Sequence, residues 1–252
     1  MGWNASWAFG VAAALIALTP ASAAAPDRAE RWNRLPNWHG VWRMTGPAVF
    51  DPATVTPKTG AAGRPGVRER PPYNRQWEAK YAANIAAVRK GTWPELATTC
   101  GLPAGMPGMM SLPNGYEWAI TPSQIWMVAE NGGNNNRRIY TDGRKHPAGD
   151  DLLPSYTGHS IGHWEGGTLV IDTVGLRDDM IVDRTGIVLS GEAHVVERVR
   201  RVNPTTLTDQ ITITDPVAFT RPWTVTKTYR LQPGPAYILD WACGKIRASM
   251  RK

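Results

Sequence analysis

The sequence predicts a mainly β protein in which an antiparallel meander closes into one barrel, with one helix and long loops inserted after the first strand. Short runs of strand-forming residues recur along the second half of the chain, separated by turn residues such as Asn, Gly and Pro. No helix long enough for a parallel crossover is expected between them, which favours antiparallel neighbours. Closure into a barrel removes the exposed strand edges. The predicted strands span 118–120, 125–130, 137–141, 159–164, 168–174, 194–202, 206–214, 223–231 and 237–243.

The amino-terminal segment has the pattern of a secretory signal. An apolar run spans 7–18 and small residues follow at 21–25, which is typical of a signal sequence before its cleavage site. The run is shorter than the roughly 20 residues that a membrane span requires, so cleavage is favoured over a retained anchor. We therefore expect residues 1–23 to be a signal peptide and residues 24–252 to form a single periplasmic or secreted domain, with no stable membrane insertion after cleavage.

The first strand of the barrel is predicted around Trp42, and the stretch 45–115 is predicted to be an insertion after it. Residues 45–72 are rich in Pro, Gly and Arg, which indicates extended chain without a core of its own. Apolar residues then recur at spacings of three and four over 74–90 and predict a helix. Gly91 is expected to end this helix.

Composition narrows the possible partners. The formal net charge is +7, but the Lys and Arg residues are spread along the chain, whereas a nucleic-acid-binding protein carries a basic stripe with aromatic residues between the charges. Neither a Gly-rich dinucleotide motif nor a phosphate-binding lysine motif is present. We therefore expect no nucleic-acid partner and no cofactor. The stretch GHSIG (158–162) leads into a hairpin and not into the strand–turn–helix of a serine hydrolase.

The two cysteines, Cys100 and Cys243, predict one disulfide, because an even count is typical of exported proteins. A bond that closes so long a loop would stabilise the fold by roughly 4 to 5 kcal/mol. Two free thiols are the alternative, and the spacing excludes a Cys-x-x-Cys redox motif.

The segment most informative about function is 159–174. If the glycines at 166–167 form a two-residue turn, this segment is a hairpin, and one face carries His159, His163 and Asp172. A carboxylate that accepts an imidazole N–H orients the ring and raises its basicity, so this face predicts acid–base catalysis if it lines the barrel lumen. The opposite face resembles a packed surface and carries Ser160, Gly162, Trp164, Leu169, Ile171 and Thr173.

Two other interpretations of the same face stay open. The face can point to solvent, where histidines and an aspartate need no special role. It can also form a metal site, in which His194 or Glu197 from a neighbouring strand joins His159 and His163. Those two histidines are separated by roughly 13 Å along a strand, which is too far for one ion to bridge without help, so we expect no metal.

Substrate-binding residues are predicted among aromatic and polar side chains of the strands. The chain contains 12 Trp but only 3 Phe, and indole rings provide flat apolar walls with one hydrogen-bond donor each. Glu197 is also predicted to be the buried partner of an arginine such as Arg138 or Arg221. The predicted substrate-binding residues are Trp42, Arg138, Tyr140, His194, Glu197 and Trp223.

Two resemblances to known families bear on the fold. The triplet at 40–42, Gly-Val-Trp, resembles the G-x-W signature of the first strand in lipocalins and other calycin barrels, which implies a barrel that encloses a small ligand. The stretches RRIYTDGRKHP, GHSIGHWEGGTLVIDTVG, AHVVERVRRV and TRPWTV resemble a large group of exported, mostly uncharacterised bacterial proteins. That resemblance implies export and a β fold, without an activity.

Two functions from different classes are consistent with these features. In the first, the protein is an exported, cofactor-independent enzyme of lyase, isomerase or cyclase type, in which His159 or His163, oriented by Asp172, moves a proton on a small hydrophobic or aromatic substrate inside the barrel. In the second, it is a periplasmic lipocalin-like carrier that only encloses such a ligand. Turnover of the ligand separates the two.

Overall fold

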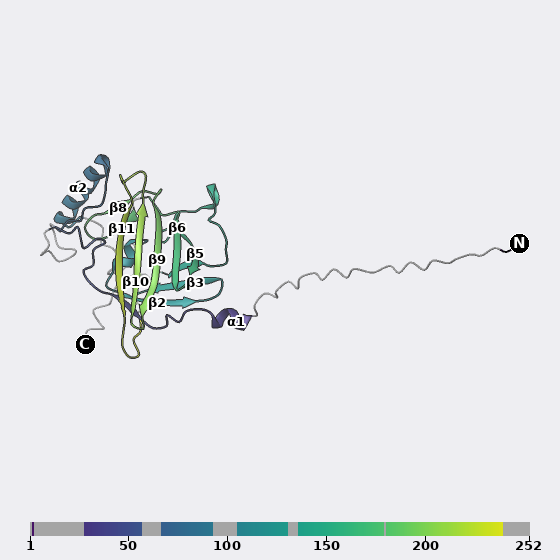
Figure 1. The fold of residues 1–252 in the computed structure, drawn as a ribbon. Helices are drawn as coiled ribbons and strands as arrows, with labels where there is room; N and C mark the ends of the chain where they lie inside the picture. The colour runs from purple at the N-terminus through teal and green to yellow at the C-terminus, as the bar shows by residue number, and fades with distance from the viewer. Residues whose placement is uncertain are drawn as a thin grey trace, which may run out of the picture.

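The computed structural model describes residue 2 and residues 28–56, 67–92, 105–130, 136–178 and 180–238, and nine strands among them form a closed barrel (Figure 1). Around the barrel the strands follow the order β1, β11, β10, β9, β6, β5, β4, β3, β2. Their bounds are β1 (Trp42–Met44), β2 (Gly115–Ile120), β3 (Gln124–Ala129), β4 (Asn136–Tyr140), β5 (His159–Glu165), β6 (Thr168–Val174), β9 (His194–Asn203), β10 (Thr206–Thr214) and β11 (Trp223–Leu231).

The barrel is mixed, so the prediction of a wholly antiparallel meander is wrong at one point. Strands β4 and β5 run parallel and pair only where Ile139 faces Ser160 and Tyr140 faces Ile161. The end of β4 therefore lies beside the start of β5. The connection 141–158 must therefore leave the barrel wall at the end of β4 and return to it beside the same residues. The predicted meander did not include such a connection.

A second departure is the connection between β6 and β9. These strands are neighbours in the barrel, and the chain between them forms a separate two-stranded sheet of β7 (Met180–Ile181) and β8 (Val188–Leu189). Each of these strands has only two residues, which is too short for a periodic pattern to predict.

The first strand closes the barrel as predicted. Trp42 lies opposite Leu231 on β11 and opposite Tyr116 on β2. Because β1 has only three residues, it pairs with only the last part of β11. Segments of the predicted insertion bind inward side chains along β11, both where it pairs with β1 and beyond. The contacts are Trp223 Nε1 to Asp51 Oδ2 at 2.9 Å, Lys227 Nζ to the Val49 carbonyl at 2.6 Å and the Tyr229 hydroxyl to the Met110 carbonyl at 2.7 Å.

The lumen is filled by side chains. Alternate residues of the strands point inward and belong to one buried cluster, as period-two burial predicts. This packing supplies the main apolar contribution to stability. Members of the cluster from around the barrel include Trp42, Tyr116, Met127, Ile139, Leu169, Ile171, Val195, Val199, Ile211, Trp223 and Tyr229.

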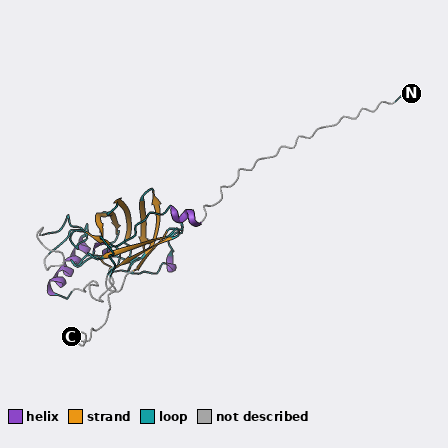
Figure 2. Cartoon of the chain, turned by 90° about the horizontal axis from the view of Figure 1, so that it is seen from below, coloured by secondary structure: helices purple, strands orange, loops and turns teal. Residues whose placement is uncertain are grey.

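The predicted helix is confirmed as α2 (Arg75–Lys90), which lies outside the barrel wall in both views (Figures 1 and 2). Asn74 caps its start by accepting a hydrogen bond from the Trp77 N–H at 3.1 Å. Gly91 ends it with a positive φ of 70°, the conformation that favours glycine after a helix. The other helical turns are α1 (Arg28–Asn33), η1 (Gly108–Ser111) and η2 (Gly149–Asp151).

Most other strand predictions are confirmed to within three residues, but several expectations fall outside the described part of the chain. Apart from residue 2, the predicted signal 1–23 lies outside the described residues, and so do Cys100 and Cys243. Of the predicted strand 237–243, residues 237 and 238 are not in a strand and the rest is not described. Among the helices of the described residues, none has the length and apolar character that a membrane crossing requires.

Candidate functional site

The predicted hairpin is confirmed, including its register. Strands β5 and β6 pair from Glu165 and Thr168 next to the turn, and Ile161 faces Asp172 in the middle. Side chains alternate along both strands, so His159, His163 and Asp172 share one face, as predicted. The turn at 166–167 explains this outcome, because it fixes the register of both strands.

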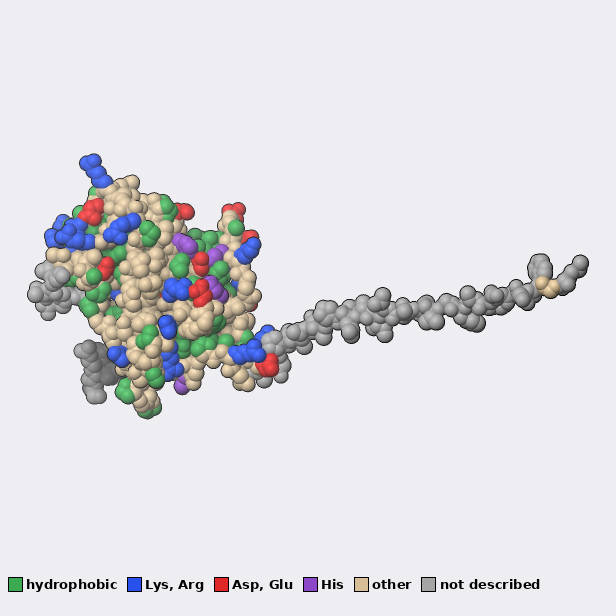
Figure 3. Space-filling view, in the orientation of Figure 1, with side chains coloured by type: hydrophobic (Ala, Val, Ile, Leu, Met, Phe, Trp, Pro, Cys, Tyr) green, Lys and Arg blue, Asp and Glu red, His purple; other side chains and the backbone are tan. Residues whose placement is uncertain are grey.

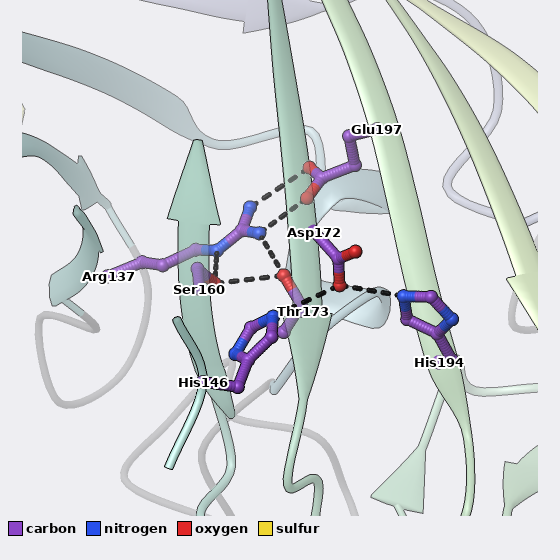
Figure 4. Close-up of polar contacts among 7 residues, drawn as sticks. All are labelled: Arg137, His146, Ser160, Asp172, Thr173, His194 and Glu197. Atoms are coloured by element: carbon purple, nitrogen blue, oxygen red, sulfur yellow. Dashed lines mark hydrogen bonds and ion pairs between the residues drawn. The ribbon is translucent and has the colours of Figure 1, made fainter. Parts of the chain in front are cut away.

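That face is the outer wall of the barrel, so the expectation that it lines the lumen is wrong. Ser160 and Thr173, on the opposite face, are fully buried and point into the lumen, whereas the Asp172 side chain is 40% exposed and that of His163 is 65% exposed. Figure 4 shows Asp172 and Thr173 leaving β6 toward two different groups of residues. In a filled barrel the packed face is the inner one, which leaves polar side chains to the outside.

The connection 141–158 returns over this outer wall and supplies a histidine, His146, to it. Leu152 packs on Gly175 and holds the connection in place, because a Cβ at position 175 would lie only 2.8 Å from Leu152 Cδ1. The Ser155 N–H also donates to the Gly175 carbonyl at 3.0 Å. The outer wall is therefore partly covered, and His146 is only 19% exposed.

Four side chains form one hydrogen-bonded chain on this wall, which we call the His–Asp network: His159, His146, Asp172 and His194. Asp172 Oδ1 lies 2.7 Å from His194 Nε2 and 3.2 Å from His146 Nε2. The Nδ1 atoms of His146 and His159 are 2.8 Å apart. The Tyr140 ring stacks on His159 with centroids 5.3 Å apart. Histidine side chains gather over this part of the surface in Figure 3.

The hydrogen bonds determine which ring nitrogens carry protons when the histidines are neutral. The Asp172 carboxylate only accepts, so His146 and His194 each donate their Nε2–H to it. Nδ1 of neutral His146 is then an acceptor, and His159 must donate its Nδ1–H to that atom. The lone pairs left for other partners are on Nε2 of His159 and on Nδ1 of His194.

The network moves the pKa values of its two terminal histidines in opposite directions. The hydrogen bond to Asp172 raises the pKa of His194, and the negative charge of Asp172 raises it further. Partial burial lowers the pKa of His159, followed by repulsion from His146 and Arg144. The pKa of Asp172 is lowered, first by its hydrogen bond from His194. Such a division is typical of an acid and a base in one site.

These shifts predict a pH-dependent contribution of His194 to stability. Its folded pKa is raised, so the stabilisation is present below the unfolded value of about 6.5 and is lost as pH rises through the folded pKa. We expect the melting temperature of the wild type to exceed that of His194→Gln by more at about pH 5.5 than at about pH 8.5. In an Asp172→Asn background, the change in melting temperature caused by His194→Gln should no longer depend on pH. If it still does, a group other than Asp172 stabilises the charged ring.

A groove of about 380 Å³ lies beside the network, and His194 forms part of its wall. We call it the His194 groove. It runs between the connection 141–158 and the ends of β6 and β9, so the same connection that delivers His146 also forms one side. Concave sites with apolar walls and a few polar groups are typical of small-molecule binding. Its apolar walls come from Leu152, Pro154, Val174, Leu176 and Ala193.

Inside the barrel, a separate polar network surrounds Arg137. Its guanidinium group pairs bidentately with Glu197, with Nη1 2.9 Å from Oε1 and Nη2 bonded to Oε2. Arg137 also donates to Thr173 Oγ1 at 2.8 Å and to Ser160 Oγ at 3.1 Å. The two charged side chains are at most 1% exposed, so this ion pair crosses the lumen away from water (Figure 4).

Glu197 was correctly predicted to be the buried partner of an arginine, but the partner is Arg137 and neither Arg138 nor Arg221. Alternation along β4 places Arg137 on the same face as Ile139, which is fully buried. That pattern was available in the sequence and indicated the inward arginine. Glu197 therefore lies in the lumen, on the other side of the wall from the His194 groove.

Two more of the predicted substrate-binding residues, Trp42 and Trp223, belong to the core. Trp42 is fully buried, and its Nε1–H donates to the Trp38 carbonyl at 2.9 Å. Trp223 packs edge-on against Phe50, with ring centroids 4.7 Å apart. Neither indole lies on the outer wall with the His–Asp network.

The remaining predicted residues lie on the outer wall at different distances from the network. Tyr140 contacts His159 directly, and Arg138 donates to the Tyr140 hydroxyl at 3.2 Å. His163, in contrast, hydrogen-bonds to Glu165 at 3.1 Å near the hairpin turn, apart from the network. The sequence did not predict His146, because a loop residue before a proline carries no periodic signal of where it folds.

Among the described residues, no group of three or more His, Cys, Asp and Glu side chains is arranged to hold a metal ion. Comparison of the chain with protein-family models, with curated proteins and with solved structures finds no match. The resemblance to lipocalins and to exported bacterial proteins therefore stays a prediction, and the functional argument depends on the geometry of the site.

Proposed function

We propose that this protein is an exported enzyme of lyase or isomerase type that acts by proton transfer on a small hydrophobic or aromatic substrate, in the His194 groove. The observation that carries the proposal is the double role of Asp172, whose Oδ1 accepts from His194 and from His146 while His194 forms part of the groove wall. The proposed site is therefore on the outer wall and not in the lumen, where the sequence suggested it.

The geometry supports proton transfer because one nitrogen of His194 is held by Asp172. This hydrogen bond orients the ring and stabilises its protonated form, as the raised pKa of His194 indicates. Nδ1 is then the atom from which a proton can be taken or given. The carboxylate keeps its negative charge throughout, since its own pKa is lowered.

His159, which bonds to His146 at the other end of the network and does not line the groove, has the opposite shift and is the candidate for the second role. Its lowered pKa keeps it neutral near pH 7, so its Nε2 accepts protons, whereas His194 is the better donor. A base that removes a proton from carbon and an acid that protonates a leaving oxygen are the groups that an elimination or an isomerisation needs. No other reactant is required for either reaction.

The test is solvent proton exchange. Purified protein is incubated in D₂O with a panel of small aromatic alcohols and ketones, and proton NMR follows deuterium incorporation and new products. We expect exchange or conversion of at least one compound by the wild type and only background with Asp172→Asn. Equal exchange by both proteins would contradict the proposal. Saturable binding without exchange or products would favour the carrier instead.

A further inference from the structure

A second, more enclosed cavity lies beside the inserted segments, apart from the His194 groove. Its volume is about 160 Å³, similar to an engineered cavity of about 150 Å³ that is known to bind benzene. Most of its wall is apolar, and its polar lining residues are Ser111, Asn114, Asp183 and Arg184. Its lining includes Ala48, Ser111, Leu112, Pro113, Val182 and Asp183.

One polar residue of this wall, Asp183, is paired with a second buried carboxyl group, that of Glu69, which does not itself line the cavity. The Phe50 N–H lies 3.1 Å from Glu69 Oε1 and 3.4 Å from Asp183 Oδ2, so the two side chains converge on one donor. Oδ1 of Asp183 is held by the N–H and the hydroxyl of Thr185, at 2.8 and 2.7 Å. Asp183 is therefore fixed in position where it meets the cavity.

The second oxygen of Asp183 is available to a ligand. Oδ2 makes a long contact of 3.4 Å to the Phe50 N–H, so it can also accept a hydrogen bond from a donor in the cavity. Burial raises the pKa of Glu69 well above its ordinary value, and the nearby Asp183 raises it further. The Asp183 side of the cavity therefore favours a ligand that carries a hydrogen-bond donor.

A hydroxyl group without a partner lies in the same wall. Ser111 is 1% exposed, and its Oγ has no hydrogen-bond partner among the residues that the structure describes. Buried hydroxyl groups nearly always have a partner, and leaving one unsatisfied is unfavourable. A polar atom bound in the cavity would supply that partner.

We propose that this cavity binds a neutral, single-ring molecule that carries a hydroxyl group, with its ring against the apolar wall and its hydroxyl between Ser111 and Asp183. The size of the cavity limits the ligand to about one ring. The proposal does not depend on the His–Asp network, because the two sites have different lining residues.

Phenol is the probe, with toluene as a comparator of the same size and benzoate as a larger one without a hydroxyl donor, and binding to the whole protein is measured by ligand-detected NMR titration. We expect phenol to bind saturably, and toluene and benzoate to bind more weakly. Ser111→Ala should weaken phenol binding about 2- to 10-fold while leaving toluene unchanged, because only phenol has a hydroxyl to pair. His194→Gln should bind phenol as the wild type does.

The second part of the experiment fills the cavity with a larger side chain. Ala48→Phe should abolish phenol binding and Ala48→Leu should reduce it, whereas Ala53→Phe, an exposed position in the same segment, should have no effect. If circular dichroism shows that Ala48→Phe is unfolded, two other measurements test the proposal. These are phenol binding to Ala48→Leu and the shifts that phenol causes in the amide signals of Ser111 and Val182. Absence of phenol binding to the wild type overturns the proposal. So does equal weakening of phenol and toluene by Ser111→Ala, or binding that His194→Gln removes.

Discussion

Replacing Arg137 with methionine is expected to lower the free energy of unfolding by about 3 to 5 kcal/mol near neutral pH. The guanidinium group is buried and makes hydrogen bonds to Glu197, Ser160 and Thr173. Methionine fills much of the same space but leaves the Glu197 carboxylate without a counter-charge in the lumen. Denaturant titration followed by tryptophan fluorescence measures the loss.

The same substitution should make stability depend more strongly on pH. Burial and the nearby Glu197 already raise the pKa of Asp209 well above its ordinary value. Without Arg137, Glu197 should take up a proton on folding. A group that gains a proton on folding loses stability as pH rises, so the deficit should be larger at about pH 8 than at about pH 5.

The matched control for this prediction is Arg198→Met. Arg198 pairs with Glu165 on the outer wall at 2.7 Å, but both side chains are nearly half exposed. Exposed ion pairs contribute little, so this variant should unfold close to the wild type at both pH values. Equal losses from Arg137→Met and Arg198→Met would show that the lumen network does not stabilise the barrel.

Asp172→Asn and His194→Gln are each expected to lower kcat for the natural substrate by about 10²- to 10⁴-fold, with little change in substrate affinity. An acid–base pair acts mainly in the transition state, whereas in the proposed site the apolar walls of the His194 groove would determine affinity. Product formation, ligand titration and thermal melting on the same preparations separate these effects.

His163→Gln is the control for that prediction. His163 is on the same strand face as His159, but its ring bonds to Glu165 and is 65% exposed. It should therefore retain wild-type kcat. A kcat that falls equally in His163→Gln and His194→Gln would contradict the assignment of His194, and a large fall in melting temperature with unchanged kcat would make the network structural.

Local periodicity explains which parts of this structure could be predicted. The two glycines at 166–167 and the alternation beyond them fixed the hairpin register, and with it the shared face of His159 and Asp172. The side of the barrel on which that face lies was mispredicted. The packed set opposite, which includes Leu169 and Ile171, was already recognised in the sequence, and in a filled barrel the packed set is the inner one.

The rest depends on contacts between distant parts of the chain. His146 reaches Asp172 because β4 and β5 pair in parallel, and only two residue pairs make that contact. No pattern in a single strand indicates such pairing. The carboxyl pair of Glu69 and Asp183 likewise joins segments that are far apart in the sequence.

Strand β6 divides its side chains between the lumen and the outer wall along one short stretch of chain, and this has an evolutionary consequence if the outer wall acts as proposed. Thr173 faces the lumen network, whereas Asp172 and Val174 face the His–Asp network and the groove. Every second codon of this strand can therefore vary under selection for a new substrate while its neighbours keep the barrel folded. A lineage that duplicated this gene could diversify its outer wall without repacking its interior.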